Sequence, residues 1–205
     1  MTRSKIKTRF LMLAAWYFFS PGSALAADWN PSGFYNSFQL AVDPKTQIVT
    51  GYYMSQTGMG PDGGPMFSCM FYVTGKREGE RASIQAYYPM DKKPRAVILG
   101  EMKFSPPDSV WLKLQELPAG GMACSEVKEG TEMTRESGGG DWMEIRVVKA
   151  KKAHFFDRPG ADAPRKSYVV QDDGIQVMET RPGWVLATFE GKSKGWLREK
   201  DLYPK

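Results

Sequence analysis

Side chains that could carry out catalysis are scarce in this chain of 205 residues. Its one histidine, His154, stands directly before Phe155 and Phe156, and a lone histidine among strand residues usually has a structural role. The sequence shows neither a nucleophile elbow nor cysteines and histidines at the spacing of a metal site. We therefore expect a binding protein rather than an enzyme, with no cofactor and no metal.

The first residues have the three-part pattern of a cleaved signal peptide. Basic residues stand at positions 3, 5, 7 and 9, an apolar run covers 10–19, and small residues precede Ala26 and Ala27. A membrane span needs about 20 apolar residues, so this run is too short for an anchor. We expect residues 1–26 to be the signal peptide, with cleavage after Ala26 or Ala27, and the mature protein to be periplasmic or secreted with no membrane span.

Two cysteines, Cys69 and Cys124, remain in the exported part. An even number of cysteines in an oxidising compartment predicts a disulfide. The alternative is two separate buried thiols. A disulfide would leave no thiol nucleophile, which again favours binding over catalysis.

The net charge of +5 falls to +1 once the four basic residues of the signal peptide are removed. Nucleic-acid binding normally requires a clustered basic surface, so this balance predicts no nucleic-acid partner.

Apolar and polar residues alternate through most of the mature chain, which is the pattern of half-buried strands. We read the fold as all-β. The first domain, 28–128, is predicted to be an antiparallel up-and-down barrel, because its strands follow one another through short connections. Its predicted strands cover 33–42, 47–55, 66–74, 82–88, 95–104, 109–116 and 121–127, and no segment has the pattern of an amphipathic helix.

Two stretches interrupt the alternation. Residues 56–67 are rich in glycine but lack the Lys-Ser/Thr pair of a phosphate-binding loop, so we expect a long hairpin loop that could contact a partner. Residues 129–141 are polar and contain three successive glycines, which predicts a flexible linker. The second domain, 142–205, then has several short strands and is predicted to be a small barrel.

Four segments of the second domain resemble the bacterial SH3-like (SH3b) domain. They are "AHFFDRPG" at 153–160, "KSYVVQDDGIQVMET" at 166–180, "GWVLATFEGKSKGW" at 183–196 and "LREKDLY" at 197–203. The resemblance implies a partly open barrel of short strands. Domains of this kind occur in exported bacterial proteins, and some bind peptidoglycan or peptides.

The first domain resembles exported lipocalin-like β-domains. The segments that carry this resemblance are "SGFYNSFQLAVDPKTQIVTGYY", "FSCMFYVTG", "IQAYYP" and "GMAC". Exported barrels of this general shape include lysozyme inhibitors and immunity proteins against bacterial toxins. That analogy concerns the fold rather than the site.

Aromatic residues supply the candidate binding surface. Trp184 alternates with the apolar Val185, Ala187 and Phe189, so its ring is expected to face solvent or a partner while theirs face the core. Its candidate neighbours are Tyr168 and Phe155, with Tyr53 and Tyr87 as outward-facing aromatics of the first domain, and Lys192, Lys194 and Arg198 as cations for an anionic polymer. The alternative for each aromatic residue is ordinary packing, which we favour for Trp196.

These observations predict an exported, non-catalytic binding protein of the bacterial envelope that docks on peptidoglycan or on a wall-associated protein. One alternative is a periplasmic inhibitor or immunity protein that blocks a toxin or wall hydrolase. A second is a small-molecule carrier that uses the interior of the first barrel.

Overall fold

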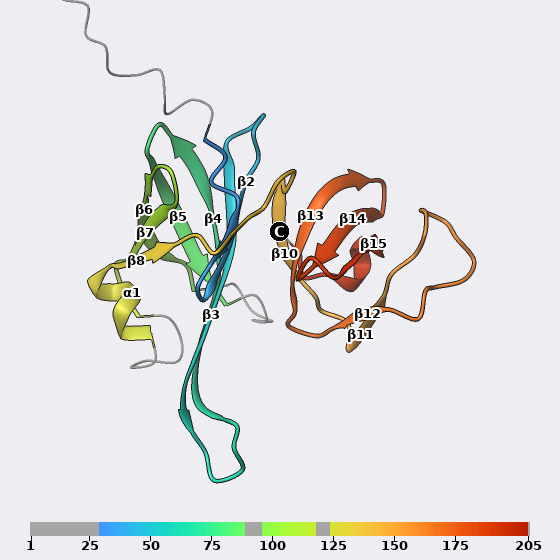
Figure 1. The fold of residues 1–205 in the computed structure, drawn as a ribbon, viewed down its shortest axis with the longest axis horizontal. Helices are drawn as coiled ribbons and strands as arrows, with labels where there is room; N and C mark the ends of the chain where they lie inside the picture. Colours follow the sequence, from blue (N-terminus) through green and yellow to red (C-terminus); the bar gives the residue numbers. More distant parts are fainter. Residues whose placement is uncertain (1–28, 89–95, 118–123, 205) are drawn as a thin grey trace, which may run out of the picture.

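The computed structural model describes residues 29–88, 96–117 and 124–204. The predicted signal peptide lies outside these ranges. The protein is all-β: 58% of the described residues lie in strands and 6% in helices, and a curled antiparallel sheet forms a half-barrel beside smaller sheets (Figure 1). The all-β prediction is confirmed. Among the described residues, no helix is long and apolar enough to cross a membrane.

The half-barrel is a meander, as the short connections predict. Within the described residues its sheet has nine strands in the order β8-β7-β6-β5-β4-β3-β2-β1-β9, so almost every neighbour in space is also a neighbour in sequence. The strands are β1 (Gly33–Tyr35), β2 (Phe38–Val42), β3 (Ile48–Met59), β4 (Pro65–Glu78), β5 (Arg81–Tyr87), β6 (Ile98–Ser105), β7 (Ser109–Leu114), β8 (Thr131–Thr134) and β9 (Ser137–Gly138).

The predicted single strand 33–42 is in fact a hairpin. Tyr35 and Phe38 face each other across a turn at Asn36, whose φ of 50° lies in the left-handed region. The turn exchanges the two faces of the strand. Tyr35, not Phe34, therefore joins Phe38 in the core of the half-barrel.

The prediction of a flexible linker over 129–141 is wrong. Glu129 ends a short helix, β8 pairs with β7, and β9 pairs with β1 at the opposite end of the sheet. The two residues between these strands, Arg135 and Glu136, also donate backbone hydrogen bonds, to Asp108 O at 2.7 Å and Phe34 O at 2.8 Å. The stretch therefore joins the two edges of the curled sheet, and its polarity reflects a solvent-facing edge rather than mobility.

The predicted strand at 121–127 is also wrong over its described part, because Ser125–Glu129 form helix α1. The predicted disulfide between Cys69 and Cys124 is present and ties the start of this helix to β4. The Tyr53 hydroxyl donates a hydrogen bond to Glu126 on the same helix. Helix α1 thus closes one side of the half-barrel.

Bulky side chains fill the inside of the half-barrel. Phe38, Phe71, Met102, Phe104 and Leu112 are all at most 2% exposed and belong to one buried cluster. Burial of this much apolar surface is the main term that stabilises the domain.

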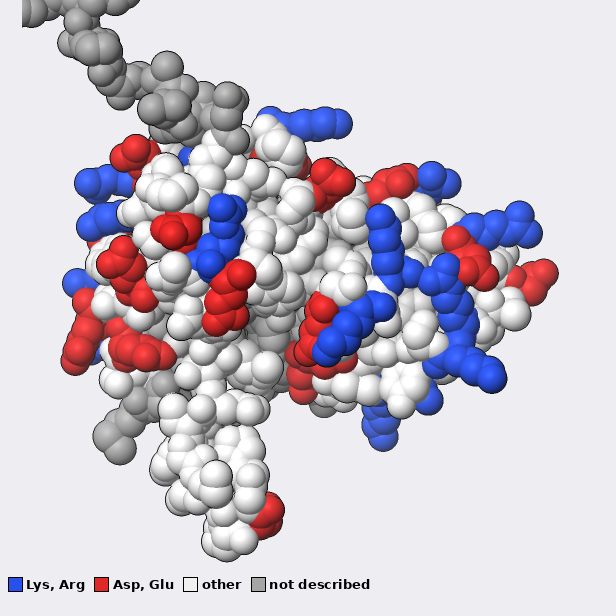
Figure 2. Space-filling view, viewed as in Figure 1, with Lys and Arg blue, Asp and Glu red and all other residues white. Residues whose placement is uncertain are grey.

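A long hairpin projects from the half-barrel (Figure 1). It is the outer part of β3 and β4, where Gln56 pairs with Ser68 and Met59 with Pro65. We call residues 56–67 the arm. The Gly-rich stretch is thus the extension and turn of a strand pair. The arm is almost free of charged side chains (Figure 2), and Met59, Met66 and Phe67 are between 56% and 81% exposed.

The second domain consists of two smaller sheets around their own core. Strands β10 (Glu144–Val147), β13 (Gly174–Arg181), β14 (Trp184–Phe189) and β15 (Ser193–Arg198) form one sheet in the order β10-β13-β14-β15. Strands β11 (Lys152–His154) and β12 (Tyr168–Val170) form a two-stranded ribbon, and a 3-10 turn, η2 (Glu199–Asp201), follows β15. Phe155, Val169, Ile175, Val185 and Leu197 are among the buried residues that they enclose.

The two domains share a buried interface. Tyr52, Tyr72 and Tyr87 of the half-barrel pack with Trp142, Ile145 and Val147 of the segment that contains β10. Strand β10 is an edge strand, and the first domain satisfies the outer backbone groups of its residue Ile145: Ile145 N donates to Thr50 Oγ1 at 2.8 Å, and the Tyr72 hydroxyl donates to Ile145 O at 2.8 Å. The domains are therefore joined by specific buried contacts rather than by a tether.

Candidate binding surface of the second domain

Trp184 is the first residue of β14 and stands on the outer face of its sheet. Val185 and Ala187 point into the core and are at most 1% exposed, whereas Trp184 is half-buried. This is the arrangement that the alternation predicts. Gly183 precedes the strand with a φ of 75°, a backbone conformation that residues with a side chain rarely adopt. Glycine therefore allows the tight turn that brings Trp184 to this edge.

The Trp184 ring is held by one aromatic residue and one cation. The Phe156 ring meets it edge to face, with 5.1 Å between centroids, and the Arg198 guanidinium lies 4.8 Å from the Phe156 centroid and 5.8 Å from that of Trp184. Edge-to-face ring pairs and guanidinium–ring contacts are both favourable. A half-buried tryptophan held in this way presents a rigid apolar surface.

Trp196 occupies a different environment, although its sequence context looks the same. It is 7% exposed, pairs with Leu186 across β14 and β15, and is covered by the Arg181 guanidinium at 4.8 Å from the ring centroid. Gly195 before it lies inside β15 rather than in a turn. A Cβ atom there would lie 3.1 Å from Phe156 O, which is tighter than an ordinary contact, so glycine suits this close approach of the backbone.

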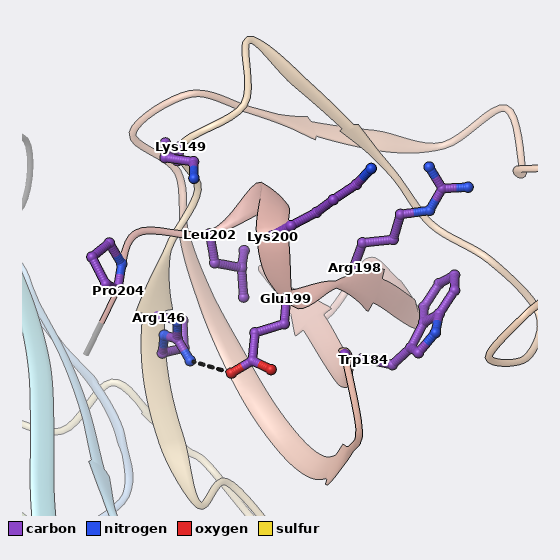
Figure 3. A pocket seen from close by; sticks show the side chains of 9 residues that line it. Arg146, Lys149, Trp184, Arg198, Glu199, Lys200, Leu202 and Pro204 are labelled. Atoms are coloured by element: carbon purple, nitrogen blue, oxygen red, sulfur yellow. Dashed lines mark ion pairs between the residues drawn. The ribbon is translucent and has the colours of Figure 1, made fainter.

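A pocket of about 700 Å³ opens beside Trp184 (Figure 3). Its lining combines the end of β15 and η2 with the start of the domain: Arg146, Lys149, Gly183, Trp184, Arg198, Glu199, Lys200, Leu202 and Pro204. Four of these side chains are cations and one is a carboxylate, so the pocket has a marked positive charge. We call it the cationic pocket.

Three of the five predicted binding residues are buried: Phe155, Tyr53 and Tyr87. Their assignment to a binding surface is wrong. Phe155 is fully buried in the core of the second domain, and Phe156 is buried with its ring against Trp184, so neither of the adjacent rings is exposed. Tyr53 points into the half-barrel, where it stacks on Phe71 at 4.8 Å between centroids. Burial and the hydrogen bond to Glu126 raise the pKa of the Tyr53 phenol above its ordinary range.

Tyr87 is buried for another reason. Its ring faces outward from the half-barrel, but the second domain covers it, and it packs against Tyr72 at 5.3 Å between centroids. Tyr52 is buried in the same way. The aromatic residues outside the half-barrel do mark an interface, and that interface lies within the chain.

Tyr168 is exposed, as predicted, with 46% of its surface accessible. Its ring contacts are with Lys152, whose ammonium lies 3.7 Å from the centroid, and with His154 at 5.6 Å. Tyr168 does not line the cationic pocket. The structure thus places Tyr168 in the β11–β12 ribbon and not beside Trp184.

Of the cations expected near Trp184, only Arg198 lines the pocket. Lys192 forms an ion pair with Glu190 at 2.8 Å in the preceding turn. The other three cations, Arg146, Lys149 and Lys200, were not predicted. Arg146 and Lys149 come from β10 and the segment after it, distant in sequence from Trp184, and only the closure of the domain brings them there.

The described residues have no arrangement typical of a metal site, since no three His, Cys, Asp or Glu side chains are grouped to hold an ion. The Nδ1 atom of His154 lies 3.0 Å from Arg165 O, which gives this histidine a structural contact. A second cavity, of about 340 Å³, lies at the domain junction. Its lining residues are Asp43, Ile48, Thr50, Tyr72, Thr74, Tyr87, Met143, Glu144, Val177 and Thr180.

In comparisons with known proteins, no family model, no curated protein and no solved structure matches this chain. The SH3b-like and lipocalin-like resemblances therefore stay predictions.

Proposed function

We propose that this protein is an exported, non-catalytic binding protein of the bacterial envelope, and that its second domain docks on peptidoglycan or on a wall-associated protein at Trp184. One observation carries the proposal: a half-buried tryptophan, fixed by Phe156 and Arg198, forms a wall of a cationic pocket. An aromatic surface suits a sugar ring or an apolar peptide side chain, and the cations suit the acidic groups of wall polymers.

Two further features support the proposal. The Cys69–Cys124 disulfide is consistent with an exported protein. The buried junction between the domains would hold the second domain at a fixed orientation on the first. The described titratable residues give no support to an enzyme, because both cysteines are paired and His154 is engaged with Arg165 O.

The proposal is tested by sedimentation of the purified mature protein with isolated sacculi, in parallel with capture from envelope extract. We expect retention on sacculi, or capture of one envelope protein, that weakens as salt rises, because exposed charges are screened at high ionic strength. A protein that remains in the supernatant in both assays at low salt would contradict the proposal.

The arm favours the inhibitor as a second candidate function. It is narrow, nearly uncharged, and carries exposed Met59, Met66 and Phe67 at its outer part. Such a projection could enter the cleft of a toxin or wall hydrolase. The described residues give no comparable support to the carrier alternative, because bulky side chains fill the half-barrel.

The arm is tested by replacing residues 57–67 with Asn-Gly, which would join the paired residues Gln56 and Ser68 by a tight turn. If the second domain alone mediates docking, this variant keeps the parental melting temperature and the parental retention on sacculi. Selective loss of capture of an envelope enzyme would instead assign the docking role to the arm.

A further inference from the structure

Arg146 has an unsatisfied donor in the cationic pocket. Its side chain is only 4% exposed, and its Nη2 donates to Tyr203 O at 2.6 Å. Its Nη1 is buried and forms no hydrogen bond with any described residue. A buried charged donor without an acceptor is costly, so this atom points to an acceptor that the described residues do not supply.

The nearby carboxylates do not fill this role. Glu199 Oε1 lies 3.8 Å from Nη1, and Glu144 Oε1 lies 4.0 Å from Nε, both beyond the range of an N–H···O hydrogen bond. Glu199 is about half exposed, so water competes for its carboxylate. Figure 3 shows the Arg146–Glu199 ion pair on one side of the pocket and Trp184 on the other.

The remaining lining indicates which anion would fit. Lys149 and Lys200 add two charges that carry no fixed geometry. The backbone N–H groups of Lys149, Glu199 and Leu202 are already bound to Asp201 O, Gly183 O and Glu199 O. The pocket therefore offers one directed donor and diffuse positive charge, not the cradle of backbone amides typical of phosphate sites.

The geometry points to a carboxylate-binding site: Arg146 Nη1 binds the carboxylate of a singly charged ligand whose apolar or sugar part lies against Trp184. The net positive charge of the pocket attracts a doubly charged phosphate as well as a carboxylate, so the preference for a carboxylate rests on the single directed donor and on the backbone amides that are already engaged. The carboxylate belongs to a peptide chain end or to an acidic sugar. This inference rests on the proposed function, because it names the chemistry of the ligand that the second domain holds.

Four probes test the inference by amide chemical-shift titration of the whole mature protein at low salt: N-acetyl-alanyl-alanine, its C-terminal amide, glucuronic acid and inorganic phosphate. We expect the peptide acid or the sugar acid to bind, which distinguishes the two sources. The neutral amide should bind at least about tenfold more weakly, as expected for loss of a charged hydrogen bond. Equal binding of acid and amide, tighter binding of phosphate, or no binding of either acid would overturn the inference.

Two variants distinguish between an external ligand and Glu199 as the partner of Arg146. Arg146→Met should weaken binding of the acid probe at least about tenfold. Glu199→Gln should tighten it, because a repulsive charge leaves the pocket. If Glu199 is instead the partner, Glu199→Gln will lower the melting temperature and will not tighten binding. Should Arg146→Met fail to fold, the exposed Lys149→Ala and Lys200→Ala test whether the acid probe sits in this pocket: each should weaken its binding, because a positive charge leaves the pocket, and unchanged binding by both would overturn the site.

Retention on sacculi, measured on the same variants, distinguishes the inference from the proposed function. If Arg146→Met retains parental binding to sacculi while the acid probes bind nowhere, the carboxylate site is wrong and the docking proposal stands. If the acid probes bind at the pocket but the parent protein binds neither sacculi nor an envelope protein, the docking proposal is wrong and the carboxylate site stands on its own.

Discussion

Tyr72 in the half-barrel and Ile145 in the second domain are joined by a buried hydrogen bond, from the Tyr72 hydroxyl to Ile145 O at 2.8 Å. Ile145 N in turn donates to Thr50 Oγ1. Both outer backbone groups of one edge-strand residue thus find partners on the other domain. The two domains should therefore unfold together, not as separate units.

Tyr72→Phe is predicted to lower the free energy of unfolding by about 1–3 kcal/mol, because it leaves a buried carbonyl without its donor. Tyr52→Phe is the matched control. Tyr52 faces Tyr72 across β3 and β4, but its hydroxyl donates to the weakly accepting thioether of Met70 rather than to a backbone carbonyl of the described residues. Denaturant titration measures both variants. Equal losses, or two separate transitions in the parent protein, would contradict the role assigned to this contact.

The disulfide gives a second prediction. Cys69→Ser and Cys124→Ser should each lower the stability of the protein by up to roughly 4 kcal/mol, the chain-entropy value for a loop of this length. The double variant should add little, since both changes remove the same bond. Thiol counts on denatured protein provide the chemical check: equal counts with and without reductant would show that no bridge forms in the purified protein.

Asp172 gives a prediction about pH. Burial raises the pKa of its carboxyl group above the ordinary value of 3.8, and hydrogen bonds from Gln171 and Tyr203 oppose this rise. A folded-state pKa above the unfolded value means that the folded state binds the proton more tightly. Stability contributed by this group is therefore present at low pH and is lost as pH rises through the raised pKa.

Asp172→Asn should accordingly raise the melting temperature at pH 7, and the gain should vanish below about pH 3.8, where the parent carboxyl is also protonated. Asparagine also tolerates the φ of 74° at this position. Thermal melts at pH 3, 5 and 7 provide the measurement, with Asp62→Asn in the exposed arm as the control. A gain that persists unchanged at pH 3 would show that the effect is not electrostatic.

Local alternation predicted most strands because a side-chain period of two follows from strand geometry alone. It could not predict that Asn36 would turn the chain and exchange the faces of Phe34 and Tyr35. Nor could it predict that Tyr87, although it faces outward, would be buried by a second domain.

The cationic pocket shows the same limit. The position of Trp184 on the outer face follows from its neighbours along one strand. Arg146 lies in "EIRV" (144–147), where nothing local distinguishes it from any other strand arginine. Its burial, its unsatisfied Nη1 and its place opposite Trp184 depend on contacts between segments far apart in the chain.

Trp196 serves as the reference for a packing tryptophan. Trp196→Ala would open a void under Arg181 on the outer face of β14 and β15, and we expect a loss of about 3–5 kcal/mol, the usual range for a buried tryptophan. The destabilisation of Trp196→Ala is therefore the reference against which the stability of other variants of the second domain is compared.

The most direct test of the docking proposal compares the retention of Trp184→Ala and Trp111→Ala on sacculi or on the captured envelope protein. Trp111 is a matched control, because it is also half-buried and carries a cation, Lys103, at 4.1 Å from its ring, but lies on the half-barrel. We predict that Trp184→Ala weakens retention by about 1–4 kcal/mol and melts close to the parent, while Trp111→Ala binds like the parent. Parental retention by Trp184→Ala, or unfolding as severe as that of Trp196→Ala, would contradict the assignment of Trp184 to the binding surface.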